Sequence, residues 1–338
     1  MKRFKRSPLF WPTMGLCAVL LFDLIFLPGF FTIQLKNGYL YGRVIDIINN
    51  AATLMILSIG MTLVIATGGT DISVGSILAI SGAIVAQMLG PGQTARTPLA
   101  VCLLVALAVS AVLGCWNGML VAVVGVSPMV ATLILNVAGR GIAQLITGGQ
   151  IPTVIYKPFC MIASYVPGMP LPFSVLIVIL MFVLAELYTR KTSFGMFVES
   201  VGTNATASRY SGINAVMIVF LTYVISGLCA GVGGFITTSI IKAADANNAG
   251  YLIEMDAILS VALGGTKMTG GRFSLGASII GALIIQSLTT TLYAWGVPPQ
   301  VLPVVKAVVV ILICLIQSEE FRGLLGRIGN GERKRAHA

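Results

Sequence analysis

The sequence LSIGMTLVIATGGTDISVGSILAISGA, residues 57–83, contains two apolar runs separated by the break Thr-Gly-Gly-Thr-Asp. A helix that crosses a bilayer needs about 20 predominantly apolar residues, and comparable runs lie on both sides of this stretch. Small residues recur in both runs, and in lipid such residues let helices approach one another closely. The stretch therefore predicts two packed membrane helices joined by a non-helical break.

The composition extends this prediction to the whole chain. The 338 residues are 57% hydrophobic and 9% charged, whereas soluble domains carry roughly 25% charged residues. We expect an all-α polytopic membrane protein with about ten transmembrane helices, forming one domain over residues 1–338. The helices are expected near residues 11–31, 47–67, 73–90, 98–125, 128–147, 171–189, 215–240, 255–266, 275–294 and 301–317. The eighth is too short to span fully, which predicts a broken or re-entrant element enclosed by protein.

Basic residues predict the orientation. They gather in the opening MKRFKR and the closing ERKRAHA, and the net charge is +10. With short tails (1–10 and 318–338) in the cytoplasm, 14 of the 21 basic residues face inward, as the positive-inside rule requires. This pattern favours membrane topology over nucleic-acid binding as the source of the charge. No cleavage site follows the first apolar run, so we expect an uncleaved first helix.

A second stretch is similar to the first. LSVALGGTKMTGGRFSLGASIIGA, residues 259–282, again has an apolar run, a Gly-Gly-Thr break and a helix rich in small residues. Either this is an internal repeat, which is common in transporters, or glycine-rich sequences are alike by chance. The breaks predict gating positions at Gly68, Gly69, Asp71, Gly264 and Gly265. Asp71 either gates a pathway or caps the helix expected from Ser73, and both can hold.

Polar residues inside apolar helices are the candidates for a solute pathway. Ionisable groups are costly in a membrane, and Arg140 either lines a polar pathway or extends its charge to the interface. Amides supply paired donors and acceptors without net charge, as a sugar requires; the alternative is hydrogen bonding between helices. The predicted pathway residues are Asn49, Asn117, Asn136, Arg140, Gln144 and Gln286.

Motifs for catalysis, metal binding and nucleotide binding are missing from the sequence. The six cysteines are scattered without a CxxC pair, and the single histidine, His337, lies in the C-terminal tail. No G-x-x-x-x-G-K-[ST] motif occurs, so the chain has no P-loop that could bind the phosphates of a nucleotide. We expect no catalytic residue, metal or cofactor in this chain.

The longest polar loop is TRKTSFGMFVESVGTNATASRYSGIN, residues 189–214, which the orientation places in the cytoplasm. Residues 199–209 predict a short amphipathic helix along the membrane face, suited to press into a groove on a soluble partner. The alternative is an ordinary connecting loop.

Four motifs together resemble the permeases of ribose-type carbohydrate ABC importers. They are ATGGTDISVGSILAISGA (66–83), CWNGMLVAVVGVSPMVATLILNVAGRGIAQLITGG (115–149), FVESVGTNATASRYSGI (197–213) and LSVALGGTKMTGGRFS (259–274). The resemblance covers nearly the whole chain. With ADANNAG (244–250), the sequence looks closest to the permeases of galactofuranose importers, as the first of their two permeases. It departs at Thr70, where the family usually has an aliphatic residue.

The resemblance implies a bundle of about ten helices in the bacterial inner membrane, working by alternating access. It implies a second permease subunit, identical or homologous, a periplasmic sugar-binding protein, and a cytoplasmic ABC ATPase that uses ATP and Mg²⁺. Nucleic acid is not an expected partner. By similarity, the residues that couple to the ATPase are Glu199, Gly202, Asn204, Ser211 and Gly212.

Two rival functions stay open. One is an ABC permease for another pentose, a hexose or an amino acid. The other is an ion-coupled secondary transporter, which usually places carboxylates mid-membrane. Most acids here lie at helix ends or in loops, and Asp23 in the first helix is the exception.

Overall fold

The computed structural model describes residues 9–27, 29–36 and 38–317. Most of the two expected tails, 1–8 and 318–338, therefore lies outside the described residues. The long helices and the short helix α11 are α1 (Phe10–Phe26), α2 (Arg43–Ala66), α3 (Val74–Leu89), α4 (Leu99–Gly118), α5 (Pro128–Thr147), α7 (Phe173–Lys191), α10 (Ala215–Ile241), α11 (Ile253–Leu263), α12 (Leu275–Ala294) and α13 (Leu302–Gln317). A helix thus occupies each of the ten expected segments.

The remaining elements are short and lie at the ends of the bundle. They are a two-stranded antiparallel hairpin, a π-helical turn, a 3-10 turn and three short helices. Their bounds are β1 (Gln34–Lys36), β2 (Tyr39–Tyr41), η2 (Met119–Val124), α6 (Lys157–Cys160), η3 (Met161–Ala163), α8 (Phe194–Thr203) and α9 (Ala205–Tyr210). Among the described residues, this hairpin is the one named sheet in an otherwise helical chain.

Six helices of the described chain are long and apolar enough to cross a membrane, which makes the protein polytopic. They are α2, α4 with η2, α5, α7, α10 and α12. α1, α3 and α13 are apolar but shorter. The expected eighth segment forms α11, which has 11 residues and rises only about 16 Å at 1.5 Å per residue.

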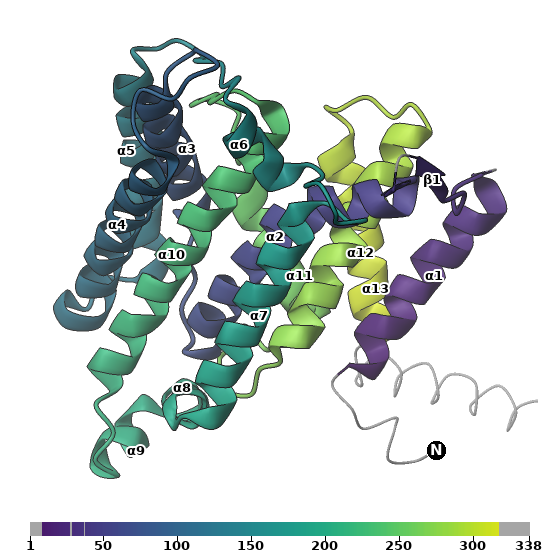
Figure 1. Cartoon of the computed structure of the whole chain (residues 1–338). Coiled ribbons are helices and arrows are strands. Elements are labelled where there is room, and N and C mark those ends of the chain that lie inside the picture. The colour runs from purple at the N-terminus through teal and green to yellow at the C-terminus, as the bar shows by residue number, and fades with distance from the viewer. Residues whose placement is uncertain (1–8, 28, 37, 318–338) are drawn as a thin grey trace, which may run out of the picture.

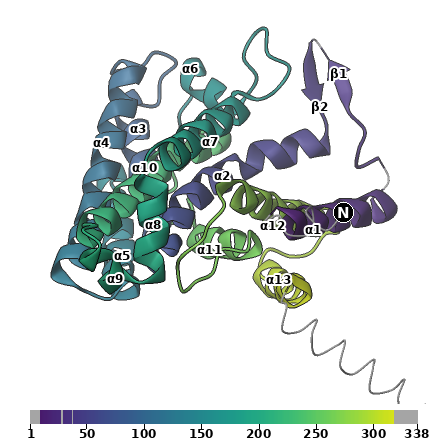
Figure 2. The ribbon, with the colours of Figure 1, turned by 90° about the horizontal axis from the view of Figure 1, so that it is seen from below.

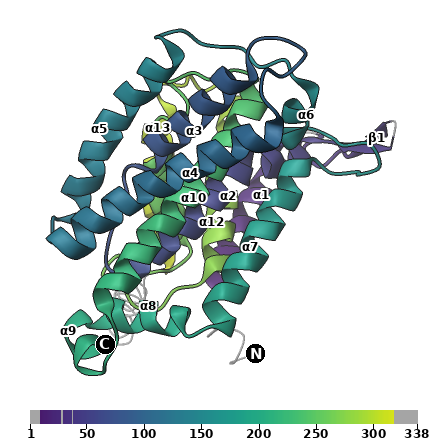
Figure 3. The ribbon, with the colours of Figure 1, turned by 60° about the vertical axis from the view of Figure 1, so that its left-hand side comes forward.

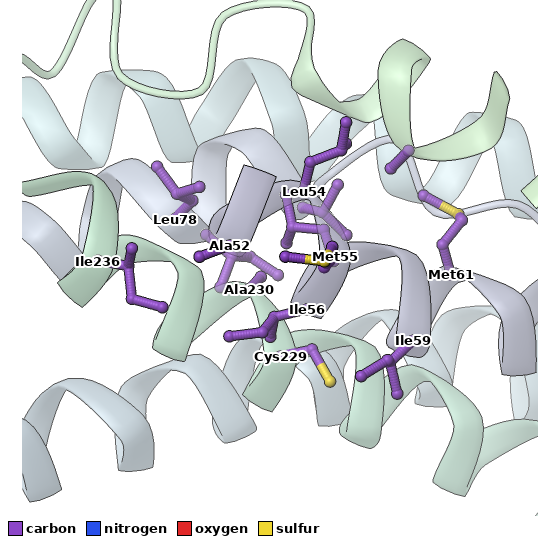
Figure 4. Close-up of a cluster of buried hydrophobic side chains, with 14 of the residues drawn as sticks. Ala52, Leu54, Met55, Ile56, Ile59, Met61, Leu78, Cys229, Ala230 and Ile236 are labelled. Carbon is purple, nitrogen blue, oxygen red and sulfur yellow. The ribbon is translucent and has the colours of Figure 1, made fainter. Parts of the chain in front are cut away.

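α2 forms the centre of the bundle. Figure 2 shows it between α3, α4 and α5 on one side and α1, α12 and α13 on the other. Of its most apolar stretch 83% is buried, against 22% for α4 with η2 and 17% for α7, so these outer helices expose apolar faces. Figure 4 shows side chains of α2 meeting those of α3 and α10 in this core.

Small residues explain the close packing of α10 on its neighbours. A Cβ on Gly60 of α2 would stand 2.8 Å from the Cα of Ser226, and one on Gly227 would stand 2.6 Å from the carbonyl oxygen of Ser110. In lipid, where apolar burial gives little drive, such close approach holds helices together. The glycines of α10 therefore allow it to pack directly against its neighbours.

The two ends of the bundle differ. α8 and α9 cover one end, and α6 and the hairpin lie at the other (Figure 1). Figure 3 shows α4 and α5 along the flank between these ends.

Candidate functional site

Asp71 lies in the break between α2 and α3 and is 1% exposed. Its Oδ1 accepts hydrogen bonds from the backbone amide of Ser73 at 3.0 Å and from the Ser73 hydroxyl at 2.6 Å. Its Oδ2 accepts from the Ser226 hydroxyl of α10 at 2.7 Å. α3 begins at Val74, one residue later than expected, and Asp71 accepts the amide just before it. Both carboxylate oxygens are therefore satisfied.

Neighbouring helices satisfy the rest of this break. Asn117 of α4 donates to the Ser73 hydroxyl at 2.8 Å, Thr132 of α5 accepts from the amide of residue 72 at 3.1 Å, and Tyr223 of α10 donates to the carbonyl of Thr70 at 3.1 Å. Non-helical backbone is tolerated at membrane depth only when protein supplies such partners. We call Asp71, Ser73, Asn117 and Ser226 the Asp71 cluster.

The amino ends of α3 and α11 meet beside this cluster. A Cβ on Gly75, the second residue of α3, would stand 2.6 Å from Oε2 of Glu254 and 2.7 Å from the carbonyl oxygen of Gly250. Glu254 is the second residue of α11 and is 5% exposed. Helix amino ends carry partial positive charge, so Asp71 and Glu254 both lie where a negative charge is favoured.

Three predicted pathway residues share one face of α5, at spacings of four. Arg140 donates to the carbonyl oxygens of Ala249 at 2.5 Å and Gly250 at 3.0 Å. Gln144 donates to the side chain of Asn247. Asn136 has a buried carbonyl oxygen without a hydrogen-bond partner among the described residues. We call Arg140 and Gln144 the α5 clamp, because they hold the segment before α11.

The other predicted pathway residues lie elsewhere. Asn49 donates to the carbonyl of Ala163 at 3.1 Å and accepts from Ser174, which joins α2 to η3 and α7. Gln286 is half-buried on α12, and its backbone carbonyl accepts from Thr290. The described hydrogen bonds connect neither residue to the α5 clamp. Asn117 belongs to the Asp71 cluster, so the six residues do not form one site.

The predicted coupling residues lie on α8, α9 and the turn that follows. Asn204 caps α9 by accepting from the amide of Ala207 at 2.9 Å, and Ser211 donates to the carbonyl of Ala207 at 3.1 Å. Gly212 has φ +82° and nothing near its side-chain position. Glu199 is half-buried and lines a shallow groove that also contains Asn204, Ser211 and Arg272. These residues remain accessible at the end of the bundle.

Gly202 differs because it packs inward. A Cβ there would stand 1.8 Å from the carbonyl oxygen of Ala66, the last residue of α2, and 2.6 Å from the amide nitrogen of Gly271. That amide donates to the same Ala66 carbonyl at 2.8 Å. A Cβ on Gly270 would meet the carbonyl of Gly202 at 2.8 Å and the amide of Gly68 at 2.9 Å. We call this meeting point of α8 with both glycine breaks the glycine junction.

The second break begins at Gly264 and Gly265. A Cβ on Gly264 would stand 2.8 Å from the amide nitrogen of Ser278 on α12, while Gly265 has φ +80° and open space around it. Gly68 also has positive φ, and Gly69 packs against the hydroxyl of Tyr223. The predicted break residues thus lie at both turns of the chain that flank the glycine junction.

Glu254, Ser226 and Tyr223 are functional candidates that sequence reasoning missed. The sequence signal for Glu254 is a carboxylate inside an apolar segment, two residues before Asp256. Asp256 itself forms an ion pair with Lys306 of α13 at 2.9 Å. The serine and tyrosine give no comparable signal, because hydroxyls occur throughout the helices.

Comparisons with known proteins extend over nearly the whole chain. A family model described as "Branched-chain amino acid transport system / permease component" matches residues 43–314. The galactofuranose transporter permease YtfT of Escherichia coli K12 is 48% identical over 93% of this chain and 92% of the relative. The fructose import permease FruF of Bifidobacterium longum is 37% identical, covering 99% and 94%. The ribose import permease RbsC of Escherichia coli is 34% identical, covering 87% and 88%. No solved structure matches.

Proposed function

The chain belongs to the family of permease components that the branched-chain amino acid transport model describes, and we propose that it carries a monosaccharide such as galactofuranose in an ATP-driven importer. The expected resemblance to ribose-type permeases is confirmed. The chain is a multi-pass transport subunit of an ABC importer and not its ATPase.

The choice of sugar over amino acid rests on the relatives. The family description names amino acids, but three relatives that cover most of this chain are named for galactofuranose, fructose and ribose, and the first is 48% identical. Among them, galactofuranose is favoured by this identity. An amino acid is the second candidate, because the family description names it.

The membrane arrangement is part of the proposal. Both termini lie in the cytoplasm of a bacterial cell, and ten helices cross or enter the inner membrane as one domain. α2 with α3, and α11 with α12, form an internal repeat, since each is a helix, a glycine break and a helix. Hydroxyl–hydroxyl contacts join the two pairs, between Ser58 and Ser260 at 2.5 Å and between Thr62 and Ser278 at 2.8 Å.

The proposed pathway follows α5, with Asn136, Arg140 and Gln144 offering donors and acceptors to hydroxyl groups. α5 also presents apolar residues outward: Ile134 is 58% exposed, Val137 70% and Leu145 83%. This exposure supports a second permease subunit packed beside it. A periplasmic binding protein delivers the sugar, and a partner ATPase consumes ATP and Mg²⁺.

The glycine junction supports the proposed coupling. α8 and α9 form the surface that docks on the ATPase, through Glu199, Asn204, Ser211 and Gly212. Gly202 lies behind them, against the end of α2 and the loop before α12. A movement of α8 would therefore push both glycine breaks, because three backbones are in contact there.

Uptake by the reconstituted importer tests this function. The full complex in proteoliposomes should accumulate labelled galactofuranose when ATP is enclosed with the ATPase, with ribose, fructose and leucine as competitors. Accumulation of leucine alone would favour the amino-acid candidate. Accumulation driven by an ion gradient without ATP would refute the importer.

Glu199 gives the sharper test of coupling, because its side chain lies on the accessible side of α8. Glu199→Lys should lower ATP-dependent uptake about a hundredfold by reversing the charge at the ATPase contact, while Glu199→Gln should retain part of it. Equal membrane levels of the variants control for insertion. Gly202 variants are a poorer test of ATPase docking, because any side chain at this position would clash with the carbonyl oxygen of Ala66. Unchanged uptake in Glu199→Lys would contradict the docking role.

A further inference from the structure

Residues 242–252, which we call the strap, connect α10 to α11 at the end of the bundle opposite α8 and α9 (Figure 1). Lys242 has φ 57° and Leu252 φ 59°, and these are the two non-glycine residues with positive φ among the residues described. Residues other than glycine, asparagine and aspartate rarely adopt this backbone conformation. Such outliers persist only when the surroundings hold them, and they gather at switch regions. The strap is therefore strained at both of its ends.

The strap is held from two sides. At its start, the amide of Val154 donates to the carbonyl of Lys242 at 2.8 Å, and the amide of Ala244 donates to the carbonyl of Pro152 at 3.0 Å. Towards its end, the guanidinium of Arg140 donates to the carbonyls of Ala249 and Gly250. Only the second attachment depends on side chains from another helix, namely the α5 clamp.

Glu254 attracts the charge of Arg140 but does not form an ion pair with it. No ion pair joins Arg140 to a carboxylate within the described chain. Oε2 of Glu254 is buried and has no hydrogen-bond partner among those residues. Nη2 of Arg140 and Oε2 of Glu254 lie 3.3 Å and 2.6 Å from one point, the Cβ position of Gly75. A guanidinium satisfied by neutral carbonyls thus lies beside a carboxylate oxygen that is unsatisfied, an arrangement that buried polar groups avoid unless it has a use.

We propose that Arg140 and Glu254 are gate residues of the transport cycle, and that Arg140 exchanges the strap carbonyls for the Glu254 carboxylate when the pathway opens. The inference rests on the proposed function. In the closed state Arg140 holds the strap against α5. In the open state the two charges pair, the strap loses its second attachment, and the strain at Leu252 is released. Gly75 provides the space in which the guanidinium moves, because a side chain there would occupy it.

A disulfide across the clamp tests whether the strap must move. The side-chain ends of Gln144 and Asn247 are in hydrogen-bond contact. The thiols of a Gln144→Cys/Asn247→Cys pair can therefore be joined reversibly, by a disulfide or by a short bis-methanethiosulfonate bridge, to lock the strap. The background is an importer whose native cysteines are replaced by alanine and which retains ATP-dependent uptake. We expect oxidation to lower uptake at least about tenfold and a reductant to restore it, while each single variant is unaffected by oxidation. Full uptake by the locked permease would overturn the inference. Loss of ATP-dependent uptake in the unmodified importer would instead refute the proposed function.

Glu254→Gln tests the exchange itself with little change in size. Without the carboxylate the closed state is favoured, so uptake should fall about tenfold, and the cysteine pair should oxidise faster than in the parent. Asp256→Asn is the matched control, since Asp256 lies on the same helix but pairs with Lys306, and its oxidation rate should equal that of the parent. An oxidation rate and uptake unchanged by Glu254→Gln would exclude Glu254 as the second partner of Arg140.

Discussion

Asp71 and Glu254 are both buried acids near the amino ends of helices, α3 and α11 respectively, yet their surroundings differ. Three donors satisfy the two carboxylate oxygens of Asp71. Glu254 has an oxygen without a partner among the described residues and lies near Arg140, which is bound to backbone carbonyls instead. A fully bonded buried network fixes one structure, whereas a partly bonded one retains alternatives. The first acid thus holds the break in place, and the second is suited to change partners.

The largest effect that separates the two acids should come from Asp71→Ala. It leaves the amide and hydroxyl of Ser73 and the hydroxyl of Ser226 buried without their acceptor. We expect a loss of about 3–5 kcal/mol of stability, measured as a lower thermal midpoint of the detergent-purified complex. Glu254→Ala should lower the midpoint less, because one of its two oxygens, Oε2, has no hydrogen-bond partner among the described residues. Similar losses for the two variants would remove the contrast between them.

A smaller effect should come from Gly75→Ala, which tests the space between Glu254 and Arg140. Its Cβ would meet Oε2 of Glu254 at 2.6 Å and the Gly250 carbonyl at 2.7 Å. Overpacking of this kind costs about 1–3 kcal/mol. Gly141→Ala is the matched control, since Gly141 lies in α5 with nothing within 4 Å of its Cβ position. We expect that variant to be neutral or slightly stabilised, and equal thermal midpoints for the two variants would show that the space is not needed.

The smallest effect concerns Asp245, a third acid that is satisfied like Asp71 but partly exposed. Burial raises its pKa, but hydrogen bonds from Asn248 and Asn247 and the charge of Arg140 outweigh burial, so the pKa lies below its usual range. A lowered pKa stabilises the folded state at pH values above the pKa of the unfolded chain, about 3.9. This stabilisation is lost as the pH falls through the pKa of the folded state. Hydrogen exchange at residues 244–250, corrected for intrinsic rates, should therefore be equal at pH 7 and pH 5 and faster below about pH 4. Asp245→Asn should remove this pH dependence. Equal protection of the parent protein at all pH values would show that the ionised Asp245 carboxylate does not stabilise residues 244–250.

The sequence was sufficient to predict the helices because composition and periodicity are local properties. Every expected segment carries a helix, including the short eighth one. The hairpin before α2 was not expected, since three-residue strands give little pattern. The site was predicted only in part. Spacing along α5 groups Asn136, Arg140 and Gln144, but it cannot show that their partners are backbone carbonyls of the strap. Glu254 becomes a candidate only once the fold brings α11 against Gly75.

The buried hydroxyls of α2 have a consequence for biosynthesis. Ser58 donates to the carbonyl of Leu54 at 2.7 Å, and Thr62 donates to the carbonyl of Ser58 at 2.5 Å. Such bonds lie within one helical turn and need no other segment. The partners of these hydroxyls on α11 and α12 are synthesised some 200 residues later, with separations of 202 and 216 residues. The hydroxyls of Ser58 and Thr62 can thus enter the bilayer already hydrogen-bonded within α2, before the ribosome has synthesised the helices that will enclose them.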